Sequence, residues 1–152
     1  MSLSEIYQAL GKERFEELVR GVSIGALRTY KMYETIKVRA RLPKLNRDRL
    51  RKAVPRLWER IETGDDDLGR DLSQAILISH LDFVVEALDF LEISHDGAGF
   101  FDKDEQATDH LSDGWQARVL EKFRDRFSES LILFYVNHLG WELGEPETAF
   151  VG

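Results

Sequence analysis

The chain has 152 residues, of which 21 are basic and 28 acidic, so its formal net charge at neutral pH is −7. It contains no cysteine, which excludes a disulfide scaffold, a zinc finger and a cysteine nucleophile. An apolar fraction of 43% and a charged fraction of 32% are typical of a globular protein, and one domain is expected at this length.

Helical periodicity dominates the start of the chain. Apolar side chains recur at helical spacing over residues 4–19, and Ser4 is expected to cap this segment. Gly11 interrupts the pattern, so one kinked helix or two short ones are expected. Gly21 is expected to end it, because glycine is a frequent helix terminator.

Two further helices are expected before residue 63. Ser23 is a candidate cap for the first of them. Residues 35–42 alternate apolar and basic side chains, which is typical of a strand, but no second strand is evident to pair with it. We therefore favour a helix there. Apolar residues at steps of three and four predict the next helix over residues 46–62, with Pro55 inside it.

The longest helix is expected over residues 68–93, where apolar side chains cover most of the circumference. A long loop at residues 94–111 follows, and two more helices are expected from about residue 113 and over residues 129–142. The fold prediction is therefore all-α: a compact bundle of five to six helices with a central, largely buried helix at about 68–93.

The domain organisation follows from the same reading. Residues 1–142 are expected to form a single helical domain, and residues 143–152 a flexible C-terminal tail.

No secretory signal opens the sequence, and no stretch approaches the roughly 20 apolar residues that a membrane-spanning helix needs. We expect a cytoplasmic protein with no membrane partner.

The net charge hides a strong asymmetry along the chain. Residues 1–62 carry a formal charge of +7 and residues 63–152 carry −14, while residues 28–60 alone carry +9. Such a segment suits a polyanion or an acidic protein surface. The candidate anion- or nucleic-acid-binding residues are Arg28, Lys31, Arg39, Arg41, Arg47 and Arg51.

One short stretch inside this half resembles the helix-turn-helix of MerR-type transcription regulators. Its turn reads Gly-Val-Ser at residues 21–23, and Leu27, Arg28 and Tyr30 match the Leu-Arg-x-Tyr of the recognition helix. The resemblance covers about ten residues. It departs at Glu34, where the family has glycine, and no wing-like hairpin follows, so we do not assign the chain to that family.

The histidines suggest a different kind of site. His80 and His138 both have apolar and aromatic helical neighbours, and they are candidates for a polar pocket if their helices are adjacent. The four histidines include no His-x-x-x-His pair, and the acidic loop at residues 102–113 lacks the glycine and glutamate of an EF-hand. Neither a metal site nor a cofactor is therefore expected. Motifs for a nucleophile or a phosphate loop are also absent, so no catalytic residue is proposed and a non-enzymatic role is favoured.

Three functions remain open at this point. The leading expectation is protein–protein interaction or self-association, with dimers possible, through complementary basic (28–60) and acidic (63–113) surfaces; the partner is a second copy or an acidic protein. The first alternative is a nucleic-acid-binding module that uses the basic segment. The second is a small-molecule-binding or enzymatic bundle with a pocket at His80 and His138.

Overall fold

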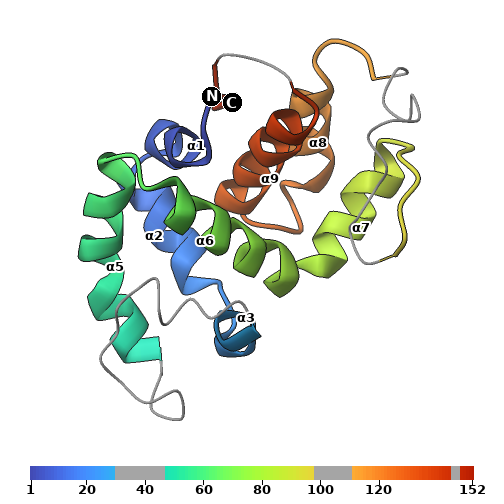
Figure 1. Cartoon of the computed structure of the whole chain (residues 1–152). Coiled ribbons are helices and arrows are strands. Elements are labelled where there is room, and N and C mark those ends of the chain that lie inside the picture. The colour runs from blue at the N-terminus through green and yellow to red at the C-terminus, as the bar shows by residue number, and fades with distance from the viewer. Residues whose placement is uncertain (30–46, 98–110, 145–147) are drawn as a thin grey trace.

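A computed structural model of the chain describes residues 1–29, 47–97, 111–144 and 148–152, and it confirms an all-helical bundle (Figure 1). The described residues form eight helices and no strand, more helices than the five to six expected. The helices are α1 (Leu3–Leu10), α2 (Lys12–Arg20), α3 (Ile24–Thr29), α5 (Arg47–Glu62), α6 (Asp66–Ser79), α7 (Leu81–Phe90), α8 (Trp115–Phe123) and α9 (Glu129–Glu142).

The first expected helix is two short helices, α1 and α2, which meet at Gly11. Gly11 has a φ of +94°, a conformation that glycine adopts without steric cost. The cap of α1 is Ser2, not the expected Ser4. The Ser2 hydroxyl accepts from the Glu5 N–H, and the Glu5 carboxylate accepts from the Ser2 N–H, so the two residues form a capping box.

The prediction of a single helix over residues 68–93 is wrong in one respect, because the segment forms two helices, α6 and α7, which meet at His80. The backbone of His80 leaves the helical region, with φ −127° and ψ +39°. The Ser79 hydroxyl donates to the Ala75 carbonyl and accepts from the Ser23 N–H at 3.0 Å, so it joins the end of α6 to the α2–α3 turn. This contact ties the break to the neighbouring turn.

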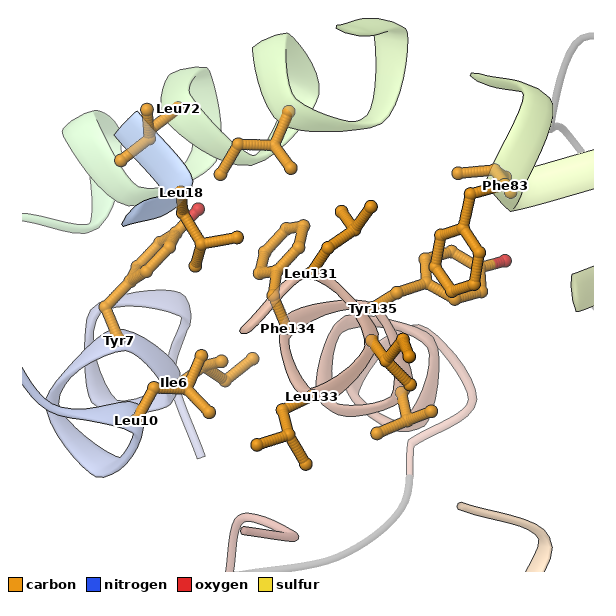
Figure 2. Close-up of a cluster of buried hydrophobic side chains, with 14 of the residues drawn as sticks. Ile6, Tyr7, Leu10, Leu18, Leu72, Phe83, Leu131, Leu133, Phe134 and Tyr135 are labelled. Atoms are coloured by element: carbon orange, nitrogen blue, oxygen red, sulfur yellow. The ribbon is translucent and has the colours of Figure 1, made fainter. Parts of the chain in front are cut away.

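The most buried helix is α9, not the segment at 68–93. Every residue from Ser130 to Gly140 is buried, so no face of this stretch reaches solvent. Ser128 caps the helix by accepting from the Leu131 N–H at 3.1 Å. Figure 2 shows the rings of Tyr7 and Phe134 side by side; their centroids are 5.6 Å apart and their planes nearly parallel.

The helices α1 and α6 approach each other closely at Gly69. A Cβ atom at this position would lie 3.3 Å from both the Leu3 Cβ and the Ser4 nitrogen. Ser4 donates its N–H to Asp66 at the start of α6, and the buried Tyr7 hydroxyl lies 2.8 Å from the Ser73 hydroxyl. Polar contacts therefore flank the place where the two backbones nearly touch.

The C-terminal segment 148–152 is attached to α9, although residues 143–152 were expected to be a flexible tail. The buried Asn137 side chain donates to the Phe150 carbonyl at 2.8 Å and accepts from the Phe150 N–H at 2.7 Å. Both chain ends consequently lie close together (Figure 1), and Met1 and Phe150 line one shared cavity.

Across the described part of the chain, no helix has the length and apolarity required to cross a membrane.

Candidate functional site

The strongest candidate site is a cavity of about 240 Å³ between the end of α2 and the start of α5. Its floor is apolar and comes from buried faces of the two helices, while its rim is charged. The lining residues are Val19, Arg20, Arg47, Asp48, Leu50 and Arg51.

Local sequence explains why these side chains meet. α2 ends at Arg20 because Gly21 follows, and Val19 turns its side chain into the core. Leu50 begins the apolar stripe that packs α5 against α2. Arg47 Nη1 donates to the Arg20 carbonyl at 2.9 Å, so an orphan acceptor at the end of α2 is satisfied by the first turn of α5. The cavity lies beside this junction.

The rim of the cavity is electropositive. Three guanidinium groups, from Arg20, Arg47 and Arg51, face one carboxylate, from Asp48. The Arg51–Asp48 contact is 3.3 Å long, but both side chains are largely exposed, so the pair neutralises the rim weakly. The N-terminus of α5 adds the partial positive charge of its helix dipole. An anionic group would find complementary charge here at little desolvation cost.

The acidic half of the chain contacts the basic segment 28–60 at the C-terminal end of α5. Arg60, near the end of α5, binds the Asp65 carboxylate through Nε and Nη2 at 2.9 and 2.7 Å. Burial of Asp65 opposes ionisation, but the Leu68 N–H and Arg60 outweigh it and hold the pKa of Asp65 below its usual range. Lys52 and Arg56 are exposed and make no ion pair with a described residue. Among the described residues, Asp48 is the carboxylate that contacts the rim of the cavity, at the start of α5.

The structure brings two of the six expected basic residues, Arg47 and Arg51, to this cavity. Arg28 belongs to α3. The other three, Lys31, Arg39 and Arg41, lie outside the described residues, as does the segment 35–42 with its strand-like pattern. Our sequence reasoning missed Arg20 and the floor residues Val19 and Leu50. The signal for Arg20 was a basic residue directly before the glycine that ends α2.

His80 and His138 pack against different neighbouring residues, and no contact among the described residues joins the two rings. The His80 ring packs on the α2–α3 turn, with Nε2 3.3 Å from the position of a Cβ at Gly21. His138 lies on α9 between the rings of Phe134 and Trp141, and its Nδ1 is 3.2 Å from Glu142. Each ring contacts its neighbours as a packed side chain does, and these contacts do not support the expected pocket at His80 and His138.

The environment of His80 predicts a pH-dependent stability. Burial lowers its pKa below 6.5, against smaller opposing effects of Asp82 and the Gly21 backbone. As the pH falls, the unfolded chain takes up the proton before the folded chain does. The free energy of unfolding is therefore highest above pH 6.5, and it decreases as the pH falls through the pKa of His80 in the folded state. We expect His80→Gln to remove this decrease.

Urea unfolding of both proteins at pH values above and below 6.5 checks the expectation. The lowered pKa values of Asp65 and Asp66 contribute equally to both proteins, so only the difference between the two curves counts. Parallel losses of stability in wild type and variant would contradict the role assigned to His80.

The described residues contain no group of three or more His, Asp or Glu side chains arranged to hold a metal ion.

Two helices, α2 and α3, flank residues 21–23, which carry the resemblance to a helix-turn-helix. Comparisons with family models, curated proteins and solved structures found no match.

Proposed function

We propose that the chain is a non-catalytic cytoplasmic interaction module whose α2–α5 cavity binds an acidic segment of a protein partner. The observation that supports this is the combination of three guanidinium groups on the rim with an apolar floor. A segment that carries carboxylates on both sides of one apolar side chain satisfies both features. Its carboxylates accept from Arg47 and Arg51, and its apolar group enters the cavity and packs on the aliphatic stems of the rim arginines above the buried Val19 and Leu50.

The apolar floor favours a protein segment over nucleic acid as the occupant. A phosphate backbone uses the charged rim alone, and its binding is dominated by counterion release. A protein segment gains additional free energy from packing apolar atoms on the aliphatic stems of the rim arginines, and this contribution persists at high salt. Salt dependence therefore separates the two occupants experimentally.

Fluorescence anisotropy with a labelled short peptide of Glu and Asp around one central Phe tests the proposal. We expect binding that weakens by about tenfold or more, or at least about 1.4 kcal/mol, in Arg47→Glu with Arg51→Glu. The matched control is Lys52→Glu with Arg56→Glu, which reverses the same number of charges on α5 outside the cavity and is expected to retain most of the affinity.

A second peptide with Ser in place of Phe measures the contribution of the floor and is expected to bind more weakly. Equal losses in both charge-reversal variants would mean that the peptide senses only the overall field of α5. Tight binding of duplex DNA or single-stranded RNA with no peptide binding would overturn the proposal in favour of a nucleic-acid module.

A further inference from the structure

The acidic surface that best complements the cavity lies at the other end of the same molecule, on α7. Asp89 and Glu92 are exposed at its C-terminal end, and the ring of Phe90 remains 38% exposed between them. Phe90 contacts Phe123 along one edge, which holds the ring in place while leaving the rest accessible. This end of α7 carries carboxylates around one aromatic side chain.

Internal ion pairs leave part of this acidic charge available. Glu86 is occupied by Arg126 at 2.9 and 3.0 Å, and one oxygen of Asp89 contacts His95 at 2.7 Å. The side chain of Glu92 makes no ion pair with a described residue. Among the described residues, the C-terminal end of α7 therefore keeps acidic charge that no cation neutralises.

One chain cannot join its own two surfaces. α5 and α7 lie at opposite sides of the molecule, with α2, α6 and α9 between them (Figure 1). The helix that lines the cavity and the helix that carries the acidic end are therefore separated by the bundle. Each is free to meet the complementary surface of another copy.

We infer that the occupant of the α2–α5 cavity is the α7 end of a second copy of this chain, an inference that rests on the function proposed above. Phe90 of one copy enters the cavity above the buried Val19 and Leu50, where the stems and guanidinium groups of Arg47 and Arg51 contact its ring. Glu92 and Asp89 accept hydrogen bonds from the same rim. Charge complementarity between the two ends identifies the partner.

The contact is head-to-tail, because two different surfaces of each copy take part. Such contacts generate a ring if the rotation between copies closes, and an open chain if it does not. An open chain of copies leaves one cavity unused at one terminus and one α7 end unused at the other. Association is then expected to grow with concentration and to weaken with salt.

Two variants that each lack one surface test the inference by analytical ultracentrifugation. Arg47→Glu with Arg51→Glu removes the cavity rim. Phe90→Ser with Glu92→Asn removes the α7 end, and asparagine suits the φ of +56° at residue 92. Circular dichroism establishes that both variants are folded.

The wild-type protein is expected to increase in mass with concentration, and each variant alone is expected to remain a monomer. An equal mixture of the two variants restores one cavity and one intact α7 end, so it is expected to form a heterodimer and nothing larger. A monomeric wild type, continued association of either variant, or a monomeric mixture would each overturn the inference.

The peptide experiment separates failure of the inference from failure of the proposed function. If the wild type binds the acidic peptide but remains a monomer, the cavity serves another partner and the inference alone is wrong. If neither peptide nor second copy binds, both proposals are wrong.

Discussion

Replacing Phe134 with alanine is expected to lower the free energy of unfolding by about 3–5 kcal/mol, because the ring is fully buried and its loss leaves a cavity. Phe134 lies at the middle of α9 and stacks on Tyr7 of α1, so the substitution also removes an aromatic contact between the two helices. Urea unfolding followed by tryptophan fluorescence measures the change.

The matched control is Phe90→Ala at a concentration where the chain is monomeric. The same atoms are removed, but the Phe90 ring is partly exposed and makes one aromatic contact, so a clearly smaller loss is expected. Similar losses for both variants would show that burial on α9 does not dominate the stability.

Replacing Gly69 with leucine is expected to destabilise the fold by about 1–3 kcal/mol through overpacking. The new Cβ alone would lie 3.3 Å from the Ser4 nitrogen, and a backbone atom cannot rotate away as a side chain can. The rest of the leucine would separate α1 from α6 and stretch the hydrogen bond between the Ser4 N–H and Asp66. Thermal and urea unfolding both measure this loss.

Gly25→Ala provides a control of opposite sign. A Cβ at Gly25 in α3 meets no atom within 4 Å, and alanine favours helix over glycine by up to about 1 kcal/mol. An unchanged or raised stability is expected. A stable Gly69→Leu protein would mean that α1 can shift, and the close approach would then not constrain the bundle.

Periodicity was sufficient to predict the helices whose apolar stripes are regular. The sequence places α9 at residues 129–142, which are its bounds, and the expected stripe of Leu50, Val54, Leu57 and Ile61 is the buried face of α5. Ser23 caps α3, the helix that it was expected to cap, by accepting from the Ala26 N–H. In these segments, local propensity and tertiary packing favour the same structure.

The errors arose where tertiary contacts override local pattern. Residues around His80 look helical throughout, and the break depends on Ser79 bonding to Ser23, a residue 56 positions away. α8 begins at Trp115, after Gly114 with a φ of +81°, and no side chain caps it, so the usual capping signal is missing at this helix start. The sequence of 68–93 is apolar around its circumference, as is α9, so composition alone could not rank the two by burial.

The sequence predicted the positive charge of the α2–α5 cavity but not its shape or its lining. The basic segment identified Arg47 and Arg51, but the cavity also needs the end of α2, which is 27 residues away in the chain and meets α5 through the Arg47–Arg20 contact. Which apolar residues form a floor depends on how the two helices pack. Whether acidic side chains neutralise the arginines of the rim depends on where the fold places those side chains, and the order of residues in the sequence does not reveal their positions.

The Asn137–Phe150 clamp has a practical consequence for experiments on this protein. Because it brings the C-terminal segment next to Met1, a tag or tether attached at either chain end leaves the molecule from the same side. In Figure 1 both ends lie away from α3 and the start of α5. A sensor surface loaded through either terminus therefore presents the α2–α5 cavity to the solution in one orientation.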